Sequence, residues 1–161
     1  MFLIREAVLS DIPFLARVHV QSWQETYTGL IPDDVLYNII TLESREFQWQ
    51  RTLANPKVKV FVAFEANALI GFCSQTLQGS EAQLFTLYLL KAFQGLGFGK
   101  QLWLAALENA KAQGAKTLSL WVLEDNPTRG FYERMGGILD DSRTEKIGLA
   151  VLLEVSYLFK L

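Results

Sequence analysis

The chain has 161 residues, half of them hydrophobic and 12% aromatic, which excludes a disordered chain and predicts one domain over residues 1–161. Fifteen basic and seventeen acidic residues give a formal charge of −2, so charge provides no basis for binding nucleic acid or an anionic membrane. Cys73 is the only cysteine, which excludes an internal disulfide, and neither a signal peptide nor a membrane span can be recognised, so we expect a cytoplasmic protein.

The first third of the chain predicts one short strand followed by helices. Apolar residues recur at helical spacing from Ile12 to Trp23, after Ser10 and Asp11, which are residue types that cap helices. We expect a strand over residues 2–8 and helices over about 12–25, from a cap at Asp33 or Asp34 to Ile40, and over 43–54.

From Val58 onward the pattern changes to the alternation that is typical of a β-strand. Every second residue from Val58 to Phe64 is apolar, and a turn near Ala66-Asn67 leads into a second strand, Ala68–Leu77. The third strand, Gln83–Leu90, is almost continuously apolar. We therefore expect it in the centre of a sheet.

The remaining chain alternates between helices and strands. Residues 98–113 carry one apolar helical face, and Gly114 suits the end of that helix. This order predicts an α/β domain with a mixed sheet. The last expected elements are a strand over Thr117–Val122, a helix from Asn126-Pro127 to Gly136-Gly137, and one or two strands within Ile147–Phe159.

Three alternating glycines stand in the turn between the third strand and the helix that follows it. Glycines allow a ligand to approach the backbone, and the amides at the start of a helix favour phosphate or pyrophosphate. An ordinary glycine-rich connection is the alternative, although a plain turn rarely needs three alternating glycines. The turn reads Gln94-Gly95-Leu96-Gly97-Phe98-Gly99-Lys100.

Neither of the two common nucleotide motifs fits this turn. A Walker A loop needs glycine in place of Gln94 and serine or threonine in place of Gln101. A dinucleotide-binding fingerprint needs glycine where Lys100 stands, and it normally follows the first strand of its unit.

The spacing Q-x-x-G-x-G resembles the acetyl-coenzyme A (acetyl-CoA) pyrophosphate loop of the GNAT superfamily of N-acetyltransferases. Leu87-Tyr88-Leu89 resembles the end of the family's central strand, and Asn126–Gly136 resembles its second signature. Ser22–Pro32 and Glu154–Tyr157 resemble one large, poorly characterised subgroup. The resemblance implies a mostly antiparallel sheet of about six to seven strands, flanked by helices and splayed at a central parallel pair.

The resemblance also implies how acetyl-CoA is held as the co-substrate. The backbone at Leu87, Tyr88 and Leu89 would bind the acetyl carbonyl and pantetheine, and the glycine turn would bind the pyrophosphate. Asn126 would bond to the coenzyme or cap its helix. Only five residues separate it from Tyr132, whereas six is the commoner spacing in the family.

Tyr132 matches the family's general acid, which protonates the leaving thiolate. The alternative is a tyrosine that only packs in the core. The acceptor would be a primary amine of a small molecule or peptide. Trp23 and Tyr27, four residues apart on one helix, would line its pocket or belong to the core. Aromatic walls would favour an apolar or cationic acceptor.

The sequence does not identify a general base. Gln83 stands where the family often has a glutamate, and Glu81, Glu25 and Glu154 are candidates that can equally be surface carboxylates. Desolvation of the amine is a further route to a neutral nucleophile.

Two alternatives to acetyl transfer stay open, and several residues carry no functional prediction. A domain that senses acyl-CoA without catalysis is supported by Gln83, and transfer of a longer acyl group is not excluded. No metal site is recognisable, and we expect the apolar C-terminal strands to form a homodimer. The remaining residues are predicted to be structural: His19 buried and hydrogen-bonded, Cys73 buried and inert, and Trp49, Trp103 and Trp121 in the core.

Overall fold

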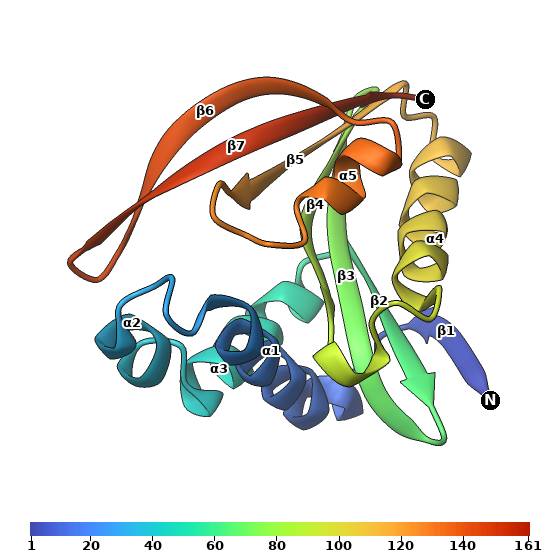
Figure 1. Ribbon diagram of the computed structural model, residues 1–161. Coiled ribbons are helices and arrows are strands. Elements are labelled where there is room, and N and C mark those ends of the chain that lie inside the picture. Colours follow the sequence, from blue (N-terminus) through green and yellow to red (C-terminus); the bar gives the residue numbers. More distant parts are fainter.

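A sheet of seven strands, in the order β1-β2-β3-β4-β5-β7-β6, runs through the computed structural model, which describes residues 1–161 (Figure 1). Every neighbouring pair is antiparallel except β4 and β5. This confirms the predicted mixed, mostly antiparallel sheet. The strands are β1 (Phe2–Glu6), β2 (Val58–Glu65), β3 (Ala68–Gln78), β4 (Glu81–Leu89), β5 (Thr117–Leu123), β6 (Ile138–Ile147) and β7 (Ala150–Lys160).

Helices cover both faces of the sheet. On one face lie α1 (Ile12–Tyr27), α2 (Asp33–Asn38) and α3 (Leu42–Ala54), and on the other lie α4 (Phe98–Ala112) and α5 (Gly130–Arg134) (Figure 1). Short 3₁₀ turns occur at Leu9–Asp11 and Lys91–Phe93. None of the helices is both long enough and apolar enough to cross a membrane.

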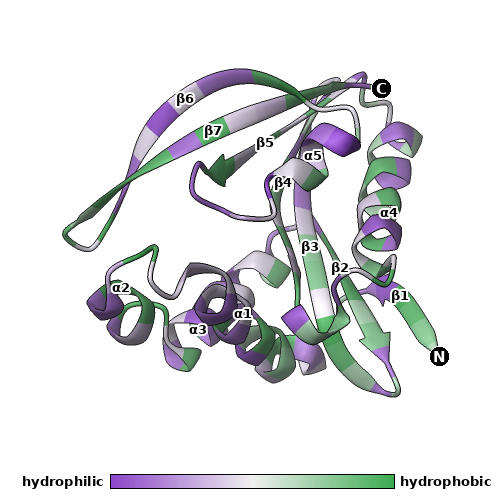
Figure 2. Cartoon of the chain, viewed as in Figure 1, coloured by the Kyte–Doolittle hydropathy of each residue, from purple (hydrophilic) through white to green (hydrophobic).

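The hydrophobic core has two main layers, one on each face of the sheet. Leu102 and Trp103 of α4 pack against Leu118 and Leu120 of β5 in a cluster of 17 buried residues. A second cluster of nine buried residues joins α1 and α3 to β2 and β3. The hydropathy colours show β2 and β3 as largely apolar strands between these layers (Figure 2).

A bulge in β4 opens the sheet beside β5. Ser74 of β3 faces Thr86 while Gln75 faces Leu84, so Phe85 is the extra residue and is half exposed. The pairing of β4 with β5 covers Glu81–Leu84 and ends at the bulge. The β5-facing edge of β4 therefore has no strand partner from Phe85 onward, which is the splay that we predicted.

Strand β6 was not predicted before Ile147. It forms the edge of the sheet, and nearly all of its residues are exposed, with a hydrophilic middle (Figure 2). Because neither face of β6 is buried, its sequence lacks the apolar alternation by which strands are recognised.

Two predicted helix caps are wrong, and a third is only half right. Asp11 stands at the N-cap of α1, but its carboxylate makes no bond to that helix and instead accepts from Val8 N at 2.8 Å and from Arg5. Asp33 and Asp34 lie in the first turn of α2, whose N-cap is Pro32. Asn126 does not cap α5, which begins only at Gly130. Polar residues before a helix have several backbone partners within reach, and tertiary contacts decide between them.

Candidate active site

The glycine turn joins β4 to α4 and has the backbone conformation that requires glycine. Gly95 has φ +76° and Gly97 has φ +86°, and Gly97 is the N-cap of α4. A Cβ on either residue would have open space around it, so backbone conformation, and not crowding, demands glycine here. The first amides of α4 are consequently open to a ligand.

A cavity of about 410 Å³ lies between this turn, β4 and α5. Its lining includes eight of the predicted site residues, together with five that were not predicted: Leu102, Thr128, Phe131, Arg134 and Met135. Phe131 and Arg134 stand on α5, and the helical spacing from Thr128 to Met135 could have indicated them in the sequence. The eight predicted residues are Leu87, Leu89, Gln94, Gly95, Gly97, Gly99, Lys100 and Tyr132.

Four residues predicted to bind the cofactor do not line this cavity. Leu96 is 63% exposed at the tip of the turn, and Phe98 stacks on Phe2 with ring centroids 4.4 Å apart. Tyr88 points to the opposite face of β4, toward α1 and α3. The fourth residue is Asn126.

The N-terminus of α4 and the charge of Lys100 meet at the end of the cavity next to the glycine turn. Lys100 and Arg134 line it, and the N-terminus of α4 opens onto the same space. Gln94 holds the turn in place, since its Nε2 donates to the carbonyl oxygen of Leu89 at 2.9 Å. This end of the cavity therefore suits a pyrophosphate, and the coenzyme part of acetyl-CoA fits the residues present.

Tyr132 is a buried phenol in the wall of the cavity. Its side chain packs on Trp103 and Phe131, with ring centroids 6.1 and 5.5 Å away. Burial, and to a smaller extent the neighbouring Tyr27 and Cys73, raise the pKa of Tyr132 well above its usual value. The hydroxyl therefore carries its proton at neutral pH, which is the state that a proton donor requires.

Asn126 connects the loop before α5 to the end of α1. Its Nδ2 donates to the hydroxyl of Tyr27 at 3.0 Å, and its Oδ1 accepts from the backbone N–H of Thr128 at 2.9 Å. Both ends of the amide are thus occupied by the protein. The structure places Asn126 as a brace for the segment that carries Tyr132.

The two predicted acceptor residues lie on the opposite side of β4 from the cavity. The rings of Trp23 and Tyr27 are 4.8 Å apart, and Trp23 is 6.3 Å from Tyr88. Tyr27 is buried in a cluster with Ile31, and burial raises its pKa to about 12. Trp23 is partly exposed and Tyr27 is a core residue.

Of the three carboxylates considered as general bases, two already accept hydrogen bonds from the protein and the third lies at the end of β4 away from the glycine turn. Glu25 Oε1 accepts from the backbone N–H of Lys91 at 3.3 Å, and Glu154 accepts from Arg143 Nε at 2.8 Å. Glu81 begins β4 at the end where that strand is still paired with β5. The Arg143 guanidinium also lies 4.1 Å from the ring centroid of Trp121, which corrects the prediction of a core position for that tryptophan.

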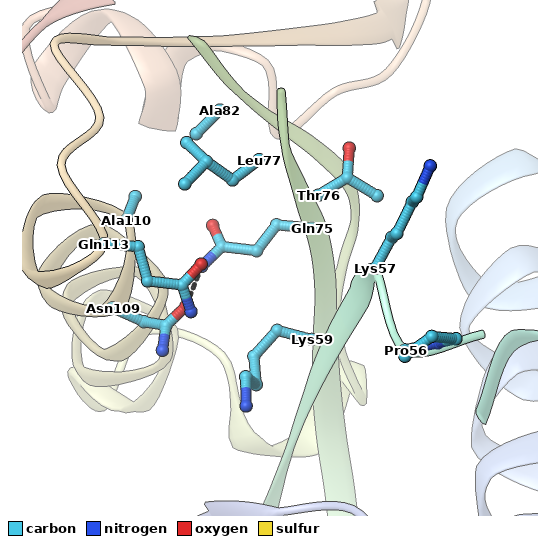
Figure 3. A pocket seen from close by; sticks show the side chains of 10 residues that line it. All are labelled: Pro56, Lys57, Lys59, Gln75, Thr76, Leu77, Ala82, Asn109, Ala110 and Gln113. Carbon is cyan, nitrogen blue, oxygen red and sulfur yellow. Dashed lines mark hydrogen bonds between the residues drawn. The ribbon is translucent and has the colours of Figure 1, made fainter. Parts of the chain in front are cut away.

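A second, smaller cavity of about 110 Å³ lies at the other end of α4 (Figure 3). Gln75 projects into it: Nε2 donates to Ala106 O at 2.9 Å and Asn109 Oδ1 at 3.1 Å, whereas Oε1 has no partner. The space accommodates water, which can donate to Oε1. It is remote from the glycine turn.

The acetyltransferase (GNAT) family model matches residues 19–137, which include the bulged strand, the glycine turn and Tyr132.

Individual relatives agree with this match. The uncharacterized N-acetyltransferase YuaI of Bacillus subtilis is 36% identical over 140 residues, covering 83% of this chain and 78% of that protein. The spermidine N(1)-acetyltransferase of Thermoplasma acidophilum is 27% identical over 144 residues, covering 86% and 89%. Among solved structures, the PaiA N-acetyltransferase of Thermoplasma acidophilum in complex with coenzyme A has a TM-score of 0.84 at 25% identity, covering 100% of this chain and 99% of that one.

Proposed function

This chain belongs to the acetyltransferase (GNAT) family, and we propose that it transfers the acetyl group of acetyl-CoA to a primary amine of a small molecule or peptide. One observation carries the proposal. The left-handed glycines, the unpaired edge of β4 and the protonated Tyr132 meet around one cavity.

Each part of the cavity has a role in holding the co-substrate. The amides of Gly95, Gly97 and the first turn of α4 bind the pyrophosphate, with Lys100 and Arg134 as counter-charges. The backbone of β4 near Leu87 and Leu89, on the edge without a strand partner, aligns the pantetheine and the acetyl carbonyl, beside the Leu89 carbonyl oxygen that already accepts from Gln94. A backbone N–H at that carbonyl also stabilises negative charge that develops during attack.

Bound acetyl-CoA supplies a thioester, whose acetyl group leaves behind a thiolate. As the amine nitrogen forms the new C–N bond, the C–S bond breaks and Tyr132 donates its proton to the sulfur; its burial keeps that proton in place until then. The surplus proton of the amine nitrogen then restores the tyrosine through solvent. The acceptor must be neutral to attack, which for an amine of pKa ~10.4 costs roughly 4–5 kcal/mol at pH 7. The apolar and aromatic surroundings on the α1 side of β4 lower this cost by disfavouring the ammonium form.

Isothermal titration calorimetry tests the co-substrate assignment first. We expect micromolar binding of acetyl-CoA, no comparable binding of ATP or NAD, and loss of binding in Gly97→Arg, which places a long cationic side chain in the turn. Titration of succinyl-CoA and propionyl-CoA under the same conditions tests whether the protein binds longer acyl groups more tightly than acetyl. Preference for ATP or NAD would contradict the proposal.

Release of free thiol with a panel of amines tests the chemistry. We expect Tyr132→Phe to bind acetyl-CoA like the wild type and to turn over at least about 100-fold more slowly, because only the proton donor is removed. Unchanged turnover in Tyr132→Phe would show that another group protonates the thiolate.

A further inference from the structure

Arg45 of α3 is a half-buried arginine without an acidic partner. It stands on the same helical stripe as Trp49 and Leu53, four and eight residues on, which pack toward the sheet. Its guanidinium makes a single, long hydrogen bond, from Nε to Ser44 Oγ at 3.4 Å. Arg5, by contrast, is paired with Asp11 through two bonds of 2.8 and 2.9 Å.

Several buried polar atoms near Arg45 also lack hydrogen-bond partners. Its charge acts on His19 of α1 and on Tyr88 of β4, whose ring centroids are 5.7 Å apart. The buried atoms that lack any hydrogen-bond partner here are His19 Nδ1, Ser22 Oγ, Trp23 Nε1 and Trp49 Nε1. His19, Ser22 and Trp49 are each no more than 3% exposed.

Most of these orphaned groups are donors. The indole nitrogens of Trp23 and Trp49 can only donate, the Ser22 hydroxyl can donate, and a guanidinium has five N–H donors and no acceptor. Buried donors without partners are costly, and a cation among them adds to that cost unless an acceptor of negative charge is supplied. No carboxylate of this chain lies within 4.0 Å of Arg45.

The cluster lies beside the reaction centre. Tyr88 stands on β4 between Leu87 and Leu89, whose side chains line the cofactor cavity on the other face of the strand. Trp23, which borders the cluster, contacts Tyr27 and so reaches the segment braced by Asn126. A carboxylate bound at Arg45 would therefore lie on the α1 side of β4, the side that we assign to the acceptor.

We propose that Arg45 and the donors around it bind a carboxylate of the acceptor, so that the acceptor is an amine that also carries an acidic group. This rests on the proposed function and specifies its substrate class. The guanidinium fork matches a carboxylate, and the indole and hydroxyl donors complete its hydrogen bonds. Amino acids and short peptides with a free or side-chain carboxylate meet this description.

The same feature argues against a polyamine acceptor. A polyamine would bring further positive charge next to an unpaired guanidinium in partly buried surroundings, where repulsion is poorly screened. Of the two kinds of acceptor that aromatic walls would favour, apolar or cationic, the cationic kind is therefore not expected at this cluster. Spermidine, the substrate in the name of one relative, is the informative negative control.

The kinetic test compares each acid with its amide, with kcat/KM referred to the neutral amine because amidation also lowers the pKa of the amine. With acetyl-CoA in excess, β-alanine is set against β-alaninamide, and glutamate against its diamide, with spermidine alongside. We expect wild-type kcat/KM to favour each acid over its amide by about 10- to 100-fold, and Arg45→Gln to abolish this preference mainly through KM. Arg45→Lys should keep most of it.

Arg51→Gln is the matched control, because Arg51 is an exposed arginine on the same helix that lies over Phe47. It should leave the preference for acids unchanged. A wild-type preference for spermidine, or a ratio of acid to amide that Arg45→Gln does not alter, would overturn the proposal. Equal acetyl-CoA affinity in all variants, measured by calorimetry, shows that the fold is intact.

A binding assay separates this inference from the proposed transfer reaction. Glutarate, which has no amine, is titrated against each protein while tryptophan fluorescence is followed, since Trp23 and Trp49 border the cluster. Saturable binding that weakens at least about 10-fold in Arg45→Gln, but not in Arg51→Gln, supports the carboxylate site even if no amine is acetylated. Glutarate binding that is equal in wild type and Arg45→Gln refutes it.

Discussion

His19 holds a neutral imidazole inside the layer between α1 and the sheet. Burial, reinforced by the charge of Arg45, lowers its pKa from 6.5 to about 3. As the pH falls, His19 is therefore protonated near pH 6.5 in the unfolded chain but only near pH 3 in the folded protein. The contribution of the neutral imidazole to the free energy of unfolding is complete above pH 6.5 and is lost as the pH falls from 6.5 toward 3.

Replacing His19 with glutamine should remove most of the acid sensitivity. From pH 7 to pH 5 we expect the wild type to lose about 2 kcal/mol of unfolding free energy through this residue, and His19→Gln to lose none by the same route. Urea unfolding at both pH values measures the difference between the two proteins. A difference that stays constant from pH 7 to pH 5 would contradict the neutral assignment.

The sequence predicted burial of His19 correctly but also predicted a hydrogen bond, and the structure leaves Nδ1 without a partner. Burial could be predicted because the residue falls on an apolar helical stripe. The partner depends on what α3 and β4 bring to the same place, and no local pattern encodes that.

At the scale of elements, β3 and β4 approach each other closely beside the cofactor cavity. A Cβ on Gly71 of β3 would lie 2.7 Å from the carbonyl oxygen of Tyr88 and 2.9 Å from Leu89 Cδ1. We expect Gly71→Ala to cost about 1–3 kcal/mol, because β4 must move, and to weaken acetyl-CoA binding, because Leu89 moves with it. Thermal unfolding and calorimetry measure the two effects.

Gly99→Ala is the contrasting variant. Gly99 is the second residue of α4, and its Cβ would meet only Leu89 Cδ2, at 3.9 Å. Alanine should therefore keep or raise the melting temperature while still weakening acetyl-CoA binding, because Gly99 lines the cavity. A parallel fall of stability and affinity in both variants would mean that the turn acts only through the fold.

The elements that the sequence predicted well are those with a regular apolar period. The alternation in β2 and β5 and the apolar stripe of α4 matched the structure within one or two residues. The predictions of strand β6 and of the start of α5 were wrong for different reasons. The edge strand buries no face, and Asn126-Pro127 forms a turn held by Tyr27, which is 99 residues away in sequence.

Across the whole molecule, the candidate site has one part made of residues that are contiguous in sequence and another made of residues that separate elements bring together. The glycine turn is a contiguous motif whose conformation follows from its own residues, so its position could be predicted. The cluster of Arg45, His19 and Tyr88 comes from three elements that only the packed fold brings together. A sequence pattern contains no signal for such a cluster, which is why Arg45 was not among the predicted residues.

Two buried groups also determine how the stability of the molecule responds to alkali. Burial raises the pKa of the Cys73 thiol from 9.0 to about 12, and that of Tyr27 from 10.0 to about 12. Both groups stay protonated in the folded protein after they have ionised in the unfolded chain. The stability they contribute is complete below pH 9 and is lost as the pH rises toward 12.

Cys73→Ala isolates the larger of these two contributions between pH 8 and pH 10. The small cavity left by the missing sulfur lowers stability by an amount that is independent of pH. The thiol itself should cost the wild type about 1.4 kcal/mol over this interval, because the unfolded thiol loses its proton and the folded one does not. The gap between wild type and variant in urea unfolding must therefore narrow from pH 8 to pH 10. A constant gap would mean that the thiol titrates normally and that water reaches this layer of the core.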